Sequence, residues 1–289
     1  MRVDLRVAEV VAVLYFGYAA ALVAIYSSSL AHRVSSCVIP FAIAALALAE
    51  SKRSRGWSRV LRDWALPGLI LLAYWQIGWI RTGPYDIRLE NLWQRWDGIL
   101  LIHLRMREIL EALGGAIPAL LELAYLLVYA SPVLGLAAVY LLRKRRRADE
   151  FLTTLLLTTF AAYALVPFFP ALPPRLAFPG QYFPDYSSPF RVFNLWLLQS
   201  GEVATSVFPS GHIAVAFGCA LGLLRVAPEK RGVWITACCY SLLVLVATVY
   251  GRYHYFADGA AGLAIALLMW PVSGWWLHAA KRSQGTIES

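Results

Sequence analysis

The sequence has few charged residues for its length. Only 15% of its 289 residues are Asp, Glu, Lys or Arg, whereas 60% are hydrophobic. A soluble domain of this size carries far more charge on its surface, so the composition excludes an ordinary soluble protein. Several continuous apolar runs approach the ~20 residues with which a helix crosses a bilayer. The sequence therefore predicts an integral membrane protein.

The apolar runs also lack the alternation of polar and apolar residues that is typical of membrane β-barrels. This absence favours an all-α, polytopic transmembrane helical bundle. There is no internal repeat and no separate soluble segment. We expect a single membrane domain, in which residues 1–115 form N-terminal spans and an interfacial segment and residues 116–289 form the main helical bundle.

Cysteine and acidic residues are scarce as well. The four cysteines lie inside apolar runs without the spacing of a metal site, so they are interpreted as packing residues (Cys37, Cys219, Cys238 and Cys239). The net charge of +9 arises from basic residues that cluster in short loops, such as Arg143 to Arg147. Because basic loops beside apolar runs mark the cytoplasmic side of a membrane, we expect no nucleic-acid partner.

The order of apolar runs and basic loops predicts a topology. We expect about eight spans, approximately at 8–30, 36–49, 64–80, 117–142, 151–169, 209–226, 233–250 and 258–280. Basic loops follow the second, fourth, sixth and eighth spans; the first of these loops contains Lys52, Arg53, Arg55, Arg59 and Arg62. This pattern predicts a plasma-membrane protein with both termini in the cytoplasm. A re-entrant second run, which is short, would change this parity.

An amphipathic segment around residues 88–113 separates the third and fourth spans. Its apolar residues recur at helical spacing among charged residues, which favours a helix lying along the outer membrane interface. We expect Asp97, His103 and Arg105 to lie on its solvated face. A contact between Asp97 and a substrate headgroup is the alternative.

The turn Pro209-Ser210-Gly211-His212 opens the sixth predicted span. Free backbone N–H groups and the helix dipole favour an anion at the amino end of a helix. Gly211 permits close backbone approach and Ser210 adds a hydroxyl donor, so the turn suits a phosphate group. In the alternative, Ser210 only caps the helix and His212 lies among lipid headgroups.

A second pair of polar residues, His254 and Asp258, is separated by four positions. On one helical turn the carboxylate can reach the imidazole and select its tautomer. A histidine oriented in this way is a competent nucleophile or general base. The alternative is that Asp258 caps a helix and His254 is near it by chance.

Two further charged residues are candidates. Arg175 follows two prolines on the same predicted face and can clamp phosphate oxygens, or it can be an interfacial anchor. Glu122 lies about one turn inside the fourth span, where a charge is costly and commonly functional. It can instead lie near enough to the interface to reach water.

The residues Thr-Ser-Val-Phe-Pro-Ser-Gly-His at 205–212, followed by His254-x-x-x-Asp258 and Gly262, resemble the motifs of the type 2 phosphatidic acid phosphatase superfamily. The resemblance covers about residues 151–270. It implies a helical bundle that uses no metal or other cofactor and acts on lipid phosphates through a phosphohistidine.

The resemblance also implies roles for individual residues. His254 would attack phosphorus, Asp258 would orient it, and His212 would protonate the leaving oxygen. The phosphoryl oxygens would be held by Ser210, Gly211 and Arg175.

Two departures from the superfamily pattern concern positive charge. Phe168 stands where a lysine is usual, and Thr248 stands where an arginine is usual, with Arg252 as a possible substitute. The sequence around Pro173-Pro174-Arg175 is more similar to the inositol phosphorylceramide synthase branch, which transfers a phosphorylated headgroup between lipids. A phosphodiester carries less charge to neutralise than a monoester, so the missing cations favour transfer.

We therefore expect a lipid phosphotransferase at the outer membrane face, with a phospholipid or lipid phosphate as substrate and a polyol or lipid as acceptor. Hydrolysis of phosphatidic acid or of a polyprenyl phosphate or pyrophosphate is the alternative. A protein of another class, one that binds or transports lipid phosphates without catalysis, also fits the residues.

Overall fold

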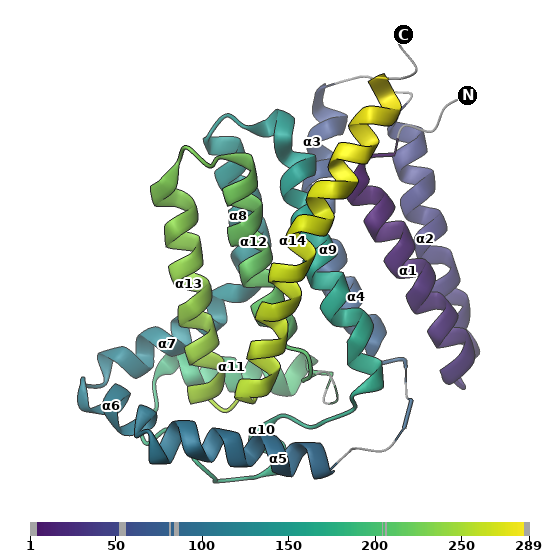
Figure 1. Cartoon of the computed structure of the whole chain (residues 1–289). Coiled ribbons are helices and arrows are strands. Elements are labelled where there is room, and N and C mark those ends of the chain that lie inside the picture. Colours follow the sequence, from purple (N-terminus) through teal and green to yellow (C-terminus); the bar gives the residue numbers. More distant parts are fainter. Residues whose placement is uncertain are drawn as a thin grey trace.

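The computed structural model is described over residues 5–51, 56–80, 82–83, 87–203, 205 and 207–285. Figure 1 shows that the regular elements of these residues are helices, which confirms the predicted all-α membrane bundle. Their bounds are α1 Val7–Tyr26, α2 Leu30–Ser51, α3 Gly56–Ala65, α4 Gly68–Ile77, α5 Ile87–Gly98, η1 Ile99–His103, α6 Met106–Ala112, α7 Ala116–Leu127, η2 Val128–Ala130, α8 Ser131–Leu141, η3 Arg145–Arg147, α9 Ala148–Leu165, η4 Val166–Phe168, α10 Pro174–Ala177, α11 Pro189–Gly201, α12 Gly211–Val226, α13 Arg231–Tyr250 and α14 Phe256–Gly285.

Within the residues that the structure describes, six stretches of helix are long and apolar enough to cross a membrane. They are Val7–Tyr26, Leu30–Ala47, Ala116–Leu141, Arg145–Phe168, Arg231–Tyr250 and Phe256–Arg282. The helix α12 is apolar but shorter. The second predicted run, whose length left its span in doubt, belongs to a helix of 22 residues, α2.

The third predicted span, 64–80, is not one continuous helix. It is divided between the end of α3 and the ten-residue helix α4. Pro67 stands at the break, where its ring removes a backbone N–H and clashes with the preceding turn. Prolines also end α9, because Pro167 lies in η4 and the chain then leaves the bundle toward Pro173 and Pro174, as predicted.

The helices α9 and α12 form the centre of the bundle. In the apolar segment that contains α9, 72% of the residues are buried inside the protein. The helix α12 packs against α8, α9, α13 and α14. Small residues allow these helices to approach closely. A Cβ atom at Gly222 would lie only 2.8 Å from Cδ2 of Phe151.

Several helices lie across one end of the bundle rather than along it. Figure 1 shows α5, α6 and α11 in this crosswise orientation. The predicted amphipathic segment is helical here, as α5, the π-helix η1 and α6. Its exposed apolar side chains include Leu92, Trp96, Ile99, Leu104 and Ile109, a face that suits a membrane interface.

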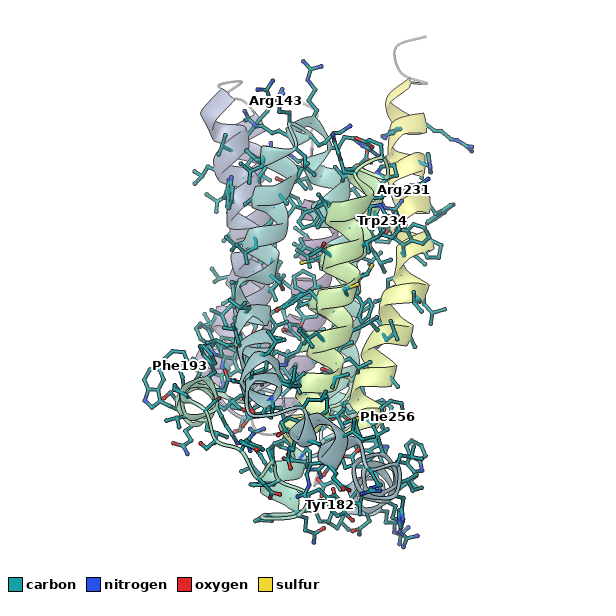
Figure 2. All side chains as sticks on the ribbon, turned by 90° about the vertical axis from the view of Figure 1, so that its left-hand side faces the viewer. Arg143, Tyr182, Phe193, Arg231, Trp234 and Phe256 are labelled. Carbon is teal, nitrogen blue, oxygen red and sulfur yellow. The ribbon has the colours of Figure 1, made fainter. Side chains whose placement is uncertain are left out.

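The opposite end of the bundle carries the basic loops. Figure 2 places Arg143 and Arg231 at this end, and Tyr182 and Phe256 at the other. Both the first turn of α1 and the last turns of α14 belong to the basic end, since Ala8 N–H donates to Asp149 and Lys281 pairs with Glu150. Three residues of the first predicted basic loop, Lys52, Arg53 and Arg55, lie outside the described residues.

Candidate active site

The Pro209-Ser210-Gly211-His212 turn forms the amino end of α12. The Ser210 hydroxyl accepts a hydrogen bond from Ile213 N at 3.4 Å and so caps the helix. The Ser210 N–H donates to the backbone oxygen of Asp258 at 3.0 Å. Gly211 is required by close packing, because a Cβ atom there would lie 2.3 Å from Cε1 of Tyr163. The turn therefore holds His212 beside the start of α14.

The loop between α13 and α14 carries the second histidine. The Thr248 carbonyl accepts from Tyr253 N at 2.9 Å and from His254 N at 3.1 Å. Arg252 adopts a left-handed backbone conformation with φ of 63°. These features end α13 and turn His254 inward, where its exposed fraction is 5%.

The two imidazoles are in direct contact. His212 Nδ1 lies 3.1 Å from His254 Nε2, and His254 Nδ1 lies 3.0 Å from the carbonyl oxygen of Val207. A carbonyl oxygen only accepts, so Nδ1 of His254 carries the proton and the neutral ring keeps a lone pair on Nε2. It follows that His212 Nδ1–H donates to this lone pair.

The carboxylate of Asp258 lies next to the same imidazole. Its Oδ2 is 3.4 Å from His254 Nδ1 and accepts from Tyr255 N at 2.8 Å. The spacing of four residues thus brings the two side chains together, although the Val207 carbonyl is the nearer partner of Nδ1. Oδ1 of Asp258 is buried and has no hydrogen-bond partner among the described residues.

The burial of His254 controls its charge. Desolvation, and next the positive charge of Arg175, lower the pKa of His254 to about 4, while the nearby Glu202 and the Val207 carbonyl act in the opposite direction. Burial disfavours the charged imidazolium. At neutral pH the ring is therefore uncharged and Nε2 keeps an unprotonated lone pair.

Arg175 is not an interfacial anchor that reaches into water. Its side chain is 8% exposed and pairs with the carboxylate of Glu202. Its guanidinium carbon lies 5.9 Å from the ring centroid of Tyr253, the residue before His254. Arg175 therefore lies beside the histidine pair, as a phosphate clamp requires.

The predicted substitute cation, Arg252, is already engaged. Its side chain is fully buried and donates to Asp97 and to Gln94. Asp97 also accepts from Phe256 N at 2.9 Å. The prediction of a solvated Asp97 is wrong, because its side chain is fully buried in this pair, which fastens the loop of His254 to α5. A headgroup contact of Asp97 and phosphate binding by Arg252 stay predictions, and the buried pair disfavours both.

Glu122 belongs to a second buried polar group. Its carboxylate accepts from Arg191 Nη1 at 2.7 Å, from Asn194 Nδ2 at 2.8 Å and from the Tyr253 hydroxyl at 2.6 Å. The side chain is 3% exposed, which excludes the alternative that it reaches interfacial water. Glu122 connects α7 and α11 to the residue next to His254.

Sequence reasoning missed several neighbours of the histidines. The Val207 carbonyl is a backbone group and carries no sequence signal. Glu202 and Arg191 were overlooked because they lie in the long connection between α9 and α12, where no spacing relates them to the motifs. The ring of Tyr125 packs 5.1 Å from that of His212 and 4.0 Å from that of Tyr253.

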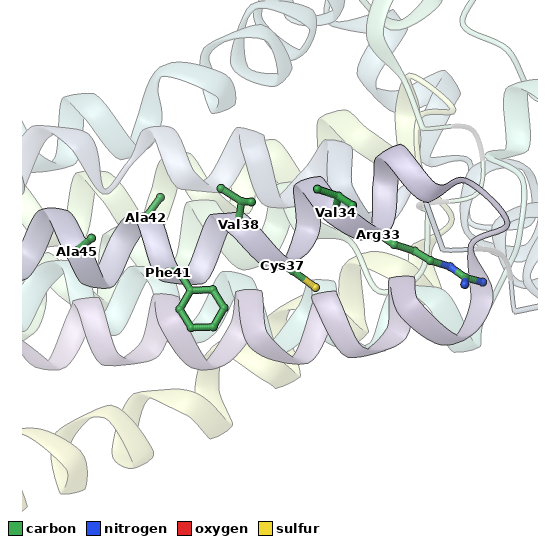
Figure 3. A pocket seen from close by; sticks show the side chains of 7 residues that line it. All are labelled: Arg33, Val34, Cys37, Val38, Phe41, Ala42 and Ala45. Atoms are coloured by element: carbon green, nitrogen blue, oxygen red, sulfur yellow. The ribbon is translucent and has the colours of Figure 1, made fainter.

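Other candidate sites are weaker. A hollow beside α2 is lined by apolar side chains and Arg33 and contains no nucleophile other than Cys37 (Figure 3). Its apolar lining suits contact with lipid chains. Within the described part of the chain, no group of three or more His, Cys, Asp or Glu side chains is placed to hold a metal ion.

Comparison with known proteins gives one family. A model described as the PAP2 superfamily matches residues 95–272, from within α5 to within α14. A curated relative, a PA-phosphatase related-family protein from Dictyostelium discoideum, is 28% identical over 128 residues. The match covers 42% of this chain and only 22% of that relative's length. No solved structure matches the chain.

Proposed function

The chain belongs to the PAP2 superfamily, and we propose that it breaks a phosphate ester of a lipid through a phosphohistidine formed on His254. The observation that carries this proposal is the pair of contacts made by His254. The Val207 carbonyl binds Nδ1, which leaves the lone pair of Nε2 facing His212. A buried, uncharged and oriented imidazole is a suitable nucleophile.

The first step forms a nitrogen–phosphorus bond. Nε2 of His254 attacks phosphorus, the ester P–O bond breaks, and the leaving oxygen takes its electron pair and a proton from His212. In-line attack places the leaving oxygen on the far side of phosphorus from Nε2. The two rings, now 3.1 Å apart at their nearest nitrogens, must therefore separate when the phosphoryl group enters.

The second step regenerates the enzyme. A hydroxyl group attacks the phosphohistidine, its proton passes to His212, and the electron pair of the N–P bond returns to Nε2. Water as the attacking group gives hydrolysis, and an alcohol gives transfer. In both steps Arg175 would bind phosphoryl oxygens, the amino end of α12 with Ser210 and Gly211 would add backbone donors, and Asp258 would help to orient His254.

We favour transfer of a phosphorylated headgroup, of the inositol-phosphate type, over hydrolysis. Arg175 and Arg252 each have a carboxylate partner, Glu202 and Asp97. Little positive charge remains to stabilise a dianionic monoester, whereas a phosphodiester brings only one negative charge. Hydrolysis of phosphatidic acid or of polyprenyl phosphates is the second candidate, supported by the printed name of the Dictyostelium relative.

The charge asymmetry supports an outward-facing site. Phe256, two residues after His254, lies at the end of the bundle opposite Arg143 and Arg231 (Figure 2). His212 lies at the same end, because its Nδ1 is 3.1 Å from His254 Nε2. Since basic loops stay in the cytoplasm, both termini would be cytoplasmic and the reaction would take place at the outer leaflet of the plasma membrane.

Replacing the histidines tests the reaction. We expect His254→Ala to lower turnover of radiolabelled short-chain phospholipids by several orders of magnitude and to abolish the labelled phosphoenzyme. His103→Ala is the matched control, because His103 is exposed at the same end of the bundle. Full turnover by His254→Ala would contradict the role of His254 as nucleophile. Binding of the lipids without turnover by the unsubstituted chain would favour a binding or transport protein.

The role of His212 and the acceptor are tested in the same assay. With a p-nitrophenyl phosphodiester the leaving group needs no proton, so His212→Ala should still form the phosphoenzyme but hydrolyse it slowly. Added inositol or glycerol should receive the phosphorylated headgroup. Release of free phosphate from monoesters alone, with no transfer to any acceptor, would contradict the preference for transfer.

A further inference from the structure

Glu202 lies beside the histidine pair although no motif contains it. It follows the last turn of α11, where its N–H donates to Leu198 O at 3.0 Å. Its carboxylate pairs with Nη2 of Arg175, and the exposed fractions of the two side chains are 18% and 8%. The pair is therefore largely withdrawn from water, where charges interact strongly.

The ion pair uses only part of the guanidinium. Nη1 of Arg175 is buried and has no hydrogen-bond partner among the described residues. Arg175 and Glu202 both act electrostatically on His254, with opposite signs. An anion that binds Nη1 and meets Nε2 of His254 must consequently approach the carboxylate of Glu202.

The other charges near the histidines do not compensate for this carboxylate. Arg252 is neutralised by Asp97 in a fully buried pair. Asp258 places a further carboxyl group 3.4 Å from His254. Each arginine beside the histidine loop is thus matched by an acidic residue, and a bound phosphate adds negative charge to this balance.

We propose that Glu202 selects the substrate by its charge, favouring lipid phosphodiesters with one negative charge over monoesters with two. This inference rests on the proposed phosphate site. The repulsion between a carboxylate and an anion is proportional to the anion's charge, so a dianion at the same place is repelled twice as strongly as a monoanion. Glu202 also neutralises Arg175, which would otherwise favour the dianion.

Glu202→Gln removes the charge and keeps an oxygen that can accept from Arg175. The test is equilibrium binding of two short-chain lipids to the full chain in detergent, with His254→Ala as background to prevent turnover. Dihexanoyl phosphatidic acid at about pH 8.5 is the dianionic probe, and dihexanoyl phosphatidylglycerol is the monoanionic probe.

The charges predict a definite relation between the two results. The repulsion energy doubles with the charge of the lipid. The factor by which Glu202→Gln increases the affinity for phosphatidic acid should therefore be about the square of the factor for phosphatidylglycerol, for example ~10-fold against ~3-fold. Glu108→Gln is the control, since Glu108 forms an exposed ion pair with Arg105 on α6. It should change neither affinity.

Three other outcomes overturn the inference. Equal increases in affinity for the two lipids, or no change in either affinity, would show that Glu202 does not discriminate charge. In that case the binding of the lipids would still support the proposed phosphate site. Absence of binding by either lipid, with or without Glu202→Gln, would overturn the proposed function together with the inference. A thermal melt of each variant identifies loss of folding. If Glu202→Gln does not fold, Glu202→Ala repeats the comparison, because it also removes the charge, and Glu202→Asp, which keeps the charge, is its control.

Discussion

At the residue scale, the candidate site depends on which atoms of a histidine are occupied. The Val207 carbonyl engages Nδ1 of His254 at 3.0 Å, and the lone pair of Nε2 is left for chemistry. Asp258 contributes a carboxylate at 3.4 Å from the same Nδ1. Two acceptors on one ring nitrogen restrict the imidazole to one tautomer and one orientation, which a nucleophile requires.

The acid limb of the pH profile should reflect the burial of His254. Because burial lowers its pKa from 6.5 to about 4, the uncharged ring that attacks phosphorus persists when the pH falls below the ordinary value. We expect kcat/KM for dihexanoyl phosphatidylglycerol, whose charge is constant in this range, to stay level between about pH 5 and pH 7 and to decline only near pH 4. An acid limb centred at the ordinary histidine pKa would show that the nucleophile is solvated.

At the element scale, α12 and α14 must touch for the site to form. The Ser210 N–H bonds the backbone oxygen of Asp258, and Gly262 faces the same turn of α12. A Cβ atom at position 262 would lie 2.6 Å from the Ser210 carbonyl oxygen. This oxygen belongs to the backbone and cannot move aside as a side chain can. This glycine sets how closely the helix of Asp258 approaches the helix of His212.

Gly262→Ala should therefore separate the two helices. We expect a loss of about 1–3 kcal/mol in stability from overpacking and a decrease in turnover, measured by thermal melting in detergent and by the phospholipid assay. Gly232→Ala is the control, because no atom lies within 4 Å of a Cβ added at Gly232 in α13. Equal melting temperatures and rates for the two variants would contradict this account of the helix contact.

The crosswise helices also position the site. The buried pair of Asp97 and Arg252 joins α5 to the loop of His254, and Glu122 with Arg191 joins α7 and α11 to the same loop. Removing one member of such a pair leaves an uncompensated buried charge, which costs more than the pair contributes. The loop therefore has two independent polar anchors.

At the scale of the whole molecule, charge separates the two ends of the bundle. Arg143 and Arg231 lie at one end, and Phe256, which follows the loop of His254, lies at the other with α5, α6 and α11 (Figures 1 and 2). Because basic loops beside membrane spans stay on the cytoplasmic side, such an asymmetry favours one orientation in a bilayer. The orientation in turn determines which leaflet supplies the substrate.

Cysteine labelling in cells tests the orientation. Asp185→Cys replaces an exposed residue at the histidine end, and Lys230→Cys replaces an exposed residue in the loop before α13. We expect a membrane-impermeant maleimide to label the first in intact cells and the second only after permeabilisation. The unsubstituted chain is the control for its four native cysteines. The reverse labelling pattern would place the site in the cytoplasm.

The class of the fold and the candidate histidines follow from the sequence alone. Long apolar runs predict helices because only internally bonded backbone is stable in lipid, and the four-residue interval between His254 and Asp258 brings their side chains within reach. These inferences need only local geometry. The prolines after α9 likewise predict where the chain leaves the bundle, because a proline cannot continue a helix.

The pairing of charged side chains depends on the tertiary fold and could not be predicted from the sequence. Asp97 has helical neighbours that suggest a solvated face, yet it is fully buried against Arg252, 155 residues away. Glu202 meets Arg175, and Glu122 meets Arg191, across similarly non-local contacts. Pairing between distant residues depends on how helices pack, and a local pattern of residue types does not encode it. For that reason the partners of Arg175, Arg252 and Glu122 could not be predicted from the sequence.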